Sequence, residues 1–138
     1  MTDNDIAALM TSLVEDLGAG DFERLLTKYS PDVVCHVGGE NSISGTHRGV
    51  AAMVKMLSES APVLGLVKVT PLWWRENRDL IFIEIEVSYE PTGAAPFTHS
   101  EALVYRIEKA EIAEVWSFDQ NQDGVDQALA GTGAVAAP

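Results

Sequence analysis

The fold is decided by residues 81–89, which read Ile-Phe-Ile-Glu-Ile-Glu-Val-Ser-Tyr. In this stretch apolar or aromatic side chains occupy every second position from Ile81 to Tyr89, and polar side chains such as Glu84 and Glu86 stand between them. Because successive side chains of a strand point to opposite faces, this alternation predicts an antiparallel strand with one face in the core and the other toward water.

The segments on both sides of this strand are rich in turn-forming residues. Residues 76–79 read Glu-Asn-Arg-Asp, and residues 91–96 read Pro-Thr-Gly-Ala-Ala-Pro. Such segments predict hairpins. We therefore expect a meander of four long strands, at about 64–75, 79–90, 97–107 and 111–119. Pro71 has no N–H to donate to a neighbouring strand, which predicts a bulge or an edge position there.

Ahead of the meander the apolar residues follow helical spacing instead. Residues 4–17 carry apolar side chains at intervals of three and four positions, which predicts an amphipathic helix. A second, short helix is expected after the N-cap Asp21, and a third helix is expected to begin near His47 and Arg48. A short strand at 32–37 stands between them. The sequence therefore predicts an α+β fold in which three helices precede a curved sheet.

The length of the chain suits one domain. We expect that domain to span residues 1–130 of the 138, with 131–138 as a flexible tail because this segment lacks polar anchors and periodicity. The longest apolar runs are far shorter than the roughly 20 residues that span a bilayer. The acidic N-terminus does not resemble a signal peptide, so a cytoplasmic protein is expected. The single cysteine, Cys35, is expected to be a small buried hydrophobic residue.

Charge and motif content exclude several classes of function. The net charge of −12 repels phosphate backbones and anionic lipid head groups, so neither nucleic acid nor a membrane is an expected partner. No Gly-rich phosphate loop, nucleophile elbow or Cys-x-x-Cys motif supports a nucleotide cofactor or covalent acyl chemistry. The three histidines lack zinc-site spacing. Residues 119–124 match a calcium loop only in part, since Ala130 stands where that loop needs a glutamate. We therefore expect no metal and no cofactor.

Short segments along the chain carry a family resemblance. They are Gly20-Asp21, His-Val-Gly-Gly at 36–39, Gly-Thr-His-Arg-Gly at 45–49 and Glu-Val-Trp-Ser-Phe-Asp at 114–119. Over residues 5–120 the chain resembles the nuclear-transport-factor-two-like superfamily and, within it, the SnoaL-like polyketide cyclases. The resemblance implies a cone-shaped, curved, mixed but mostly antiparallel sheet packed against three N-terminal helices. It leaves the substrate open, because this fold serves isomerases, cyclases, dehydratases and proteins without chemistry.

The resemblance also points to catalytic residues. SnoaL-like cyclases place an acid/base aspartate near the end of the last strand, which is the position of Asp119 here. Closing a ring by an aldol step needs one group that removes a C–H proton and delivers a proton to the developing alkoxide. His36 stands where ketosteroid isomerases, which are similar in layout, carry their general base. Two other signatures of that enzyme fall on Leu13 and Leu103, which disfavours steroid isomerisation.

The long strands also offer candidates for substrate binding. Strand parity places His99, Glu101 and Tyr105 on one face, while tryptophans and a further tyrosine supply large flat surfaces. The expected substrate-binding residues are Tyr105, His99, Glu101, Trp74, Tyr89 and Trp116. Since neighbours in a strand point to opposite faces, only one of Trp73 and Trp74 can face the cone.

Asp119 has an alternative role that the sequence leaves open. Parity groups it with Val115 and Ser117 and puts Ile112 on the opposite face. However, it is followed by Gln-Asn-Gln-Asp-Gly, and an aspartate in that context also suits a turn or a helix cap.

Two functions follow from these residues. The first is a cofactor-free acid/base enzyme, most similar to a polyketide-type aldol cyclase or a related isomerase or dehydratase, acting on a small, largely apolar substrate through Asp119 and His36. The second is a non-catalytic protein of the same fold, which binds a hydrophobic metabolite or acts as a dimeric scaffold. Convergence of Asp119 and His36 on one enclosed pocket would distinguish the two functions. A homodimer formed through the sheet is expected in both.

Overall fold

The computed structural model of the protein describes residues 3–130, so the tail expected at 131–138 lies outside the described residues. The helices are α1 (Asp3–Ala19), α2 (Phe22–Leu26), α3 (Val50–Leu64) and α4 (Gln122–Ala130). The strands are β1 (Tyr29–Val37), β2 (Gly45–Arg48), β3 (Leu66–Asn77), β4 (Leu80–Tyr89), β5 (Phe97–Glu108) and β6 (Glu111–Asp119). No helix within 3–130 is both long enough and apolar enough to cross a membrane.

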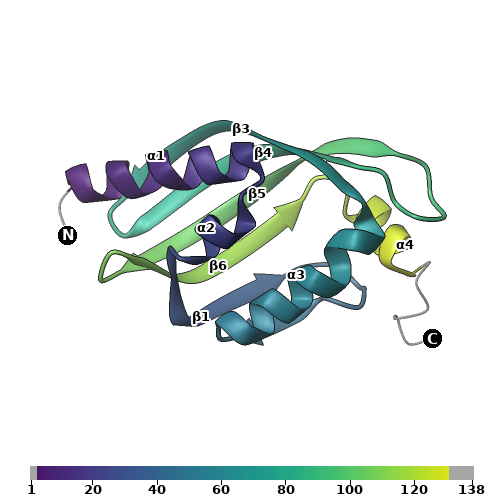
Figure 1. Cartoon of the computed structure of the whole chain (residues 1–138), viewed down its shortest axis with the longest axis horizontal. Helices are drawn as coiled ribbons and strands as arrows, with labels where there is room; N and C mark the ends of the chain where they lie inside the picture. The colour runs from purple at the N-terminus through teal and green to yellow at the C-terminus, as the bar shows by residue number, and fades with distance from the viewer. Residues whose placement is uncertain (1–2, 131–138) are drawn as a thin grey trace.

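One curved sheet organises the molecule. Its strand order is β2-β1-β6-β5-β4-β3, with β1 and β6 parallel and all other neighbours antiparallel. Helices α1, α2 and α3 lie over its concave face (Figure 1). The expected α+β fold, with three helices ahead of a mostly antiparallel curved sheet, is confirmed.

The expectation for Pro71 is confirmed as well. Strand β3 is the last strand of the sheet, and its pairing with β4 shifts between Pro71 and Trp73. Pro71 therefore lies on an edge strand and next to a bulge, where its missing N–H is tolerated.

A second irregularity, between β5 and β6, corrects the parity expected for Ile112. Arg106 pairs with Glu114, but the next residue, Ile107, pairs with Ile112, so β6 contains one extra residue at this point. Beyond such a bulge the alternation of faces is reversed. As a result Ile112 is fully buried and faces inward together with Val115, instead of pointing to the opposite face.

Two elements were not expected from the sequence. Residues 45–48, expected as the end of a loop and the start of a helix, form β2 and pair with β1. Helix α4 follows β6 directly, and Asn121 caps it: its side-chain oxygen accepts a hydrogen bond of 3.0 Å from the backbone N–H of Gly124. The polar run after Asp119 is therefore a helix start, and Asn121 rather than Asp119 is the cap.

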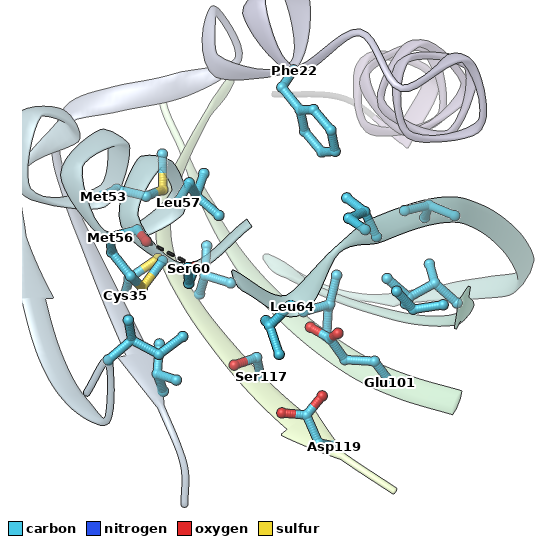
Figure 2. A pocket seen from close by; sticks show the side chains of 18 of the residues that line it. Phe22, Cys35, Met53, Met56, Leu57, Ser60, Leu64, Glu101, Ser117 and Asp119 are labelled. Carbon is cyan, nitrogen blue, oxygen red and sulfur yellow. Dashed lines mark hydrogen bonds between the residues drawn. The ribbon is translucent and has the colours of Figure 1, made fainter. Parts of the chain in front are cut away.

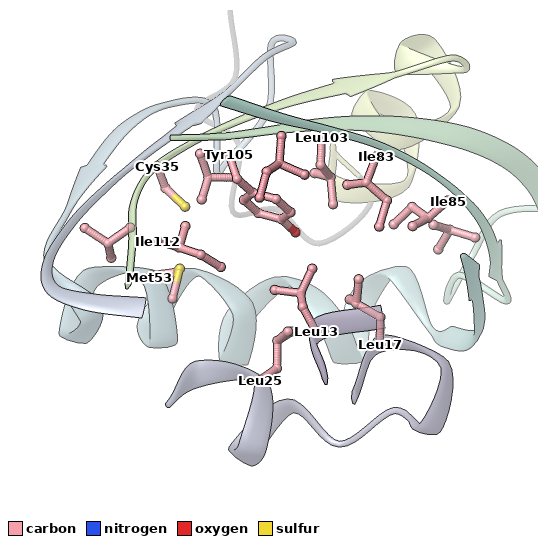
Figure 3. Close-up of a cluster of buried hydrophobic side chains, with 14 of the residues drawn as sticks. Leu13, Leu17, Leu25, Cys35, Met53, Ile83, Ile85, Leu103, Tyr105 and Ile112 are labelled. Atoms are coloured by element: carbon pink, nitrogen blue, oxygen red, sulfur yellow. The ribbon is translucent and has the colours of Figure 1, made fainter. Parts of the chain in front are cut away.

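The core lies between the helices and the concave face. Leu13, Leu17 and Leu25 from α1 and α2 face Ile83 and Leu103 of the sheet (Figure 3). Burying each such side chain contributes about 1.5–3 kcal/mol to folding. Cys35 is buried in the same cluster, as expected.

Candidate active site

A cavity of about 210 Å³ lies between the helices and the concave face of the sheet (Figure 2). Most side chains that line it are apolar, and they come from helices α1 to α4, from β1 and β3 to β6, and from the loop between β1 and β2. Its polar lining consists of Tyr29, His36, Ser60, Tyr89, Glu101, Tyr105, Ser117 and Asp119, together with the thiol of Cys35. No lysine or arginine belongs to the lining within residues 3–130.

Two carboxyl groups meet at one end of this cavity. Glu101 of β5 pairs directly with Asp119 of β6, so both side chains leave the sheet on the same face. Figure 2 shows the two groups next to each other. A side-chain hydrogen bond between them contributes to the pKa of both. Glu101 is half-buried and faces the cavity, while the Asp119 side chain is 12% exposed. Asp119 therefore points into the cavity, on the same face as Val115 and Ser117, which settles the orientation that the sequence left open.

Burial and mutual repulsion decide where the proton of this pair resides. Burial, followed by the nearby Asp119 charge and the hydrogen bond to Asp119, raises the pKa of Glu101 to about 8. Burial also raises the pKa of Asp119, but His99 and the hydrogen bond from Glu101 act to lower it. Near neutral pH the pair therefore holds one proton, with Glu101 as the acid and Asp119 as the carboxylate that accepts its hydrogen bond.

His99 lies behind Asp119 and does not line the cavity. Its Nδ1 accepts a hydrogen bond of 3.0 Å from the backbone N–H of Asn121, and its Nε2 lies 3.5 Å from an Asp119 carboxylate oxygen. Burial lowers the pKa of His99, so the ring is neutral near pH 7. The structure therefore places His99 against Asp119, not in a position to touch a ligand in the cavity as a substrate-binding residue would.

The same three residues could be considered as a metal site. One ligand atom from each of His99, Glu101 and Asp119 lies within 4.8 Å of the others. A histidine that binds a metal donates its other ring N–H to an acceptor. Here the other nitrogen of His99 faces the N–H of Asn121, so Nε2 carries the proton and is a donor. The cluster is therefore built as a hydrogen-bonded system, and its donor set does not fit a metal ion.

Tyrosines form a further part of the cavity wall. Tyr89 and Tyr105 line it, in the place expected of substrate-binding residues. Tyr29 joins them, although no sequence pattern singled it out as a binding residue. The Tyr29 and Tyr105 rings meet edge to face at 6.4 Å, and burial raises the pKa of both phenols. All three phenols are therefore neutral hydrogen-bonding groups at working pH.

Cys35 is a second cavity residue that sequence reasoning treated only as core. Burial raises the pKa of its thiol to about 11. The thiol therefore stays protonated near neutral pH and is a poor nucleophile. Ser60 and Ser117 likewise line the cavity, and their hydroxyls donate to the backbone oxygens of Met56 and His36.

His36 does not converge with Asp119. Although the residue borders the cavity, its ring stacks on Trp116 at 5.4 Å, and its Nε2 lies 2.5 Å from a Glu114 carboxylate oxygen. Glu114 and Trp116 occupy the face of β6 opposite to that of Asp119. In β1 the inward position belongs to the neighbouring Cys35, which explains why His36 turns to the outer face.

The tryptophans lie outside the cavity as well. Trp116 stacks on His36 on the outer face of the sheet. Trp74 is half-buried against the core but is not part of the cavity lining, so neither tryptophan occupies the expected substrate-binding position. Trp73 is 47% exposed and donates its ring N–H to Glu84 at 2.9 Å, which places it on the outer face.

Comparison with known proteins agrees with this architecture. Residues 10–115 match the family described as SnoaL-like domain. None of the curated proteins matches the chain. A protein of unknown function with a cystatin-like fold from Xanthomonas campestris is 27% identical, with a TM-score of 0.80 and coverage of 89% of this chain and 96% of that one.

Two further solved structures share the fold at lower identity. A protein from Mesorhizobium loti, described as a candidate SnoaL-like polyketide cyclase, is 20% identical with a TM-score of 0.74, covering 86% of this chain and 99% of its own. TerC, co-crystallised with polyporic acid, is 14% identical with a TM-score of 0.75, and the match covers 88% of this chain and 98% of TerC. Since the family match spans most of the chain and the same sheet and helices recur in these structures, the protein belongs to the SnoaL-like domain family.

Proposed function

We propose that the protein is a cofactor-free acid/base enzyme that cyclises, isomerises or dehydrates a small, uncharged and largely apolar carbonyl compound. The observation that carries this proposal is the Glu101–Asp119 pair, which shares one proton at the end of an apolar cavity. Perturbed carboxyl groups of this kind in a pocket are typical of acid/base catalysis. Asp119 is the proposed base and Glu101 the proposed acid.

The reaction uses the two carboxyl groups in opposite directions. The Asp119 carboxylate takes a proton from a carbon next to a carbonyl, and the C–H electron pair becomes the double bond of an enol. Glu101 gives its proton to the carbonyl oxygen, on which the negative charge develops. The enol carbon can then attack a second carbonyl to close a ring, or take back a proton at another position. Because a hydrogen bond joins the carboxyl groups, their starting protonation can be restored by proton transfer between them.

The charge of the cavity wall defines the substrate class. A substrate carboxylate would meet the Asp119 charge, and no lysine or arginine in the described lining would neutralise it. An uncharged carbonyl compound can instead accept a hydrogen bond from Glu101 or from a cavity tyrosine. The volume of about 210 Å³ is below the roughly 300–1,000 Å³ of pockets for drug-sized ligands, which favours a small substrate. The co-crystal of TerC with polyporic acid supports the general point that this fold accepts small organic ligands.

The test is proton abstraction itself, which all three reactions share. The protein is incubated in D₂O with a panel of small uncharged β-diketones and aryl ketones, and deuterium incorporation next to the carbonyl is followed by NMR. We expect Asp119→Asn to lower the exchange rate by about two to four orders of magnitude, the usual contribution of one acid/base group. Asp32→Asn, an exposed aspartate, and Glu86→Gln, an exposed glutamate on the outer face, are the matched controls.

The outcome also separates the enzyme from a binding protein. A binding role is favoured by the apolar character of most of the lining and by the position of His36, which leaves Asp119 without the partner expected from the sequence. If ligands from the panel bind the wild-type protein and Asp119→Asn equally well, and neither accelerates exchange, the protein is a binder and the enzyme proposal fails.

We also propose a homodimer formed through the outer face of the sheet. Large apolar side chains are exposed there, with Phe118 at 57%, Trp73 at 47% and Phe82 at 37%. They lie on β6, β3 and β4, so together they extend across the sheet. Exposed apolar clusters of this kind are typical of interfaces.

A further inference from the structure

We propose that His99 is a positioning residue that donates its Nε2–H to Asp119 and thereby assigns the shared proton to Glu101. This inference rests on the proposed acid/base function and explains how two adjacent carboxyl groups acquire different roles. It gives His99 a task that is neither substrate binding nor metal binding.

The tautomer of His99 is fixed by the start of helix α4. The backbone N–H of Asn121 donates to Nδ1 at 3.0 Å, so Nδ1 presents a lone pair and the ring proton of the neutral form resides on Nε2. Asn121 cannot easily turn away, because its carbonyl accepts from Val125 at 3.2 Å and its side chain accepts from Gly124 at 3.0 Å. The helix cap and the histidine tautomer are thus parts of one arrangement.

The Nε2–H then has one direction in which to point. The His99 side chain is 2% exposed. Among the described residues, none forms a hydrogen bond of good geometry with its buried Nε2. An Asp119 carboxylate oxygen lies 3.5 Å from this nitrogen. The rings of Tyr89 and Phe97 pack edge-on against the imidazole at 5.6 and 5.4 Å and hold its orientation. Long hydrogen bonds in an unliganded site commonly tighten once a ligand is bound.

This donor makes the two carboxyl groups inequivalent. Asp119 is faced by His99 and Glu101 from β5 and by the charge of Asp126 from α4, while Tyr89 of β4 stands near both carboxyls. The His99 dipole stabilises a negative charge on Asp119, whereas Asp126 destabilises it. Glu101, in contrast, forms its side-chain hydrogen bond with Asp119 itself. Removing the His99 donor would therefore let the proton reside on either carboxyl group, Glu101 or Asp119. Asp119 would then no longer be the group that is always available as the base.

The first test uses the wild-type protein alone, so it does not depend on a variant that folds. Nitrogen-15 NMR of the His99 ring distinguishes the two neutral tautomers and the doubly protonated form. We expect the Nε2–H tautomer from about pH 7 to about pH 9, because burial lowers the pKa of His99 and disfavours the cation. An Nδ1–H tautomer, or a charged ring at neutral pH, would overturn the proposal.

The second test compares His99→Leu, which removes the donor, with His99→Gln, whose amide can still donate toward Asp119. Carbon-13 NMR titration of both carboxyl groups should show the Asp119 titration moving up by about one pH unit in His99→Leu, a tenfold loss of carboxylate on the acidic limb. The Glu101 and Asp119 titrations should converge, and His99→Gln should restore most of their separation. Equal titrations in the wild type and in folded His99→Leu would contradict the proposal.

Three further outcomes distinguish this inference from its alternatives. If added Co²⁺ saturates at one equivalent and perturbs the His99 and both carboxyl signals, the cluster is a metal site and the positioning role is wrong. If the NMR results hold but Asp119→Asn leaves deuterium exchange unchanged, the proton arrangement stands and the proposed function fails. If deuterium exchange depends on Asp119 but the titrations of Glu101 and Asp119 are unchanged in His99→Leu, the proposed function stands and this inference fails.

Discussion

At the scale of single residues, Glu101 is both the proposed acid and a residue whose ionisation at high pH destabilises the folded protein. Its pKa rises from the ordinary 4.5 to about 8 in the folded protein, mainly through burial. The folded state therefore holds this proton more tightly than the unfolded state. Its contribution to stability is complete below about pH 4.5 and is lost progressively as the pH rises to about 8.

Glu101→Gln should remove this pH dependence. The neutral amide has nothing to ionise, so we expect the variant to melt several degrees above the wild type at about pH 9 and close to it at about pH 5. Thermal melts followed by circular dichroism at both pH values provide the measurement. Glu86→Gln, on the exposed face of the neighbouring strand, should track the wild type. A Glu101→Gln variant whose melting temperature differs from the wild type by the same amount at both pH values would show that Glu101 ionises normally.

At the scale of elements, α4 and the loop between β1 and β2 are held together by one carboxylate. Asp126 of α4 accepts hydrogen bonds from the side chains of Asn41 at 2.7 Å and Gln122 at 3.0 Å, and from the backbone N–H of Glu40 at 3.2 Å. Ile43 of the loop and Val125 of the helix both line the cavity. Asp126 therefore fixes one wall of the candidate site although it does not line that site.

Asp126→Ala should loosen this wall without unfolding the sheet. Hydrogen bonds to a charged group contribute about 1.5–3 kcal/mol, so losing several of them should speed amide exchange in residues 38–44 by at least about tenfold. Hydrogen–deuterium exchange with mass spectrometry measures this directly. Gln127→Ala, at an exposed position of the same helix, is the control. Unchanged exchange in residues 38–44 would mean that other contacts hold the loop.

At the scale of the whole molecule, the proposed dimer joins two chains that each carry a net charge of −12. Apolar burial at the outer sheet face must exceed this repulsion, so we expect dimerisation to strengthen as salt screens the charges. Phe118→Glu places a carboxylate among the exposed apolar side chains of the outer face and should yield a monomer in sedimentation velocity experiments. Gln127→Glu adds the same charge on α4 and should leave the dimer intact. A wild-type protein that sediments as a monomer at high salt would contradict the proposed dimer.

The local patterns of the sequence were sufficient for the architecture. Alternation in residues 81–89, helical spacing in 4–17 and the missing N–H of Pro71 each act within a few residues, and the structure follows all three. Parity also grouped Asp119 with Val115 and Ser117, and β6 has no irregularity between them, but only the structure shows that this face is the inward one. Features set by near neighbours along the chain can be deduced from the chain.

The composition of the candidate site was decided by tertiary structure. A hairpin extended in register from Glu108 and Glu111 would set Glu101 opposite Phe118, and only the extra residue in β6 brings it opposite Asp119. The parallel pairing of β1 with β6 likewise carries His36 to Trp116 on the outer face. A shift of one residue reverses the face of every side chain beyond it. The sequence by itself therefore determined the sheet and the helices. The tertiary structure decided that Asp119 faces inward, and strand register, which depends on contacts far apart in the chain, decided that its partners are Glu101 and His99 rather than His36.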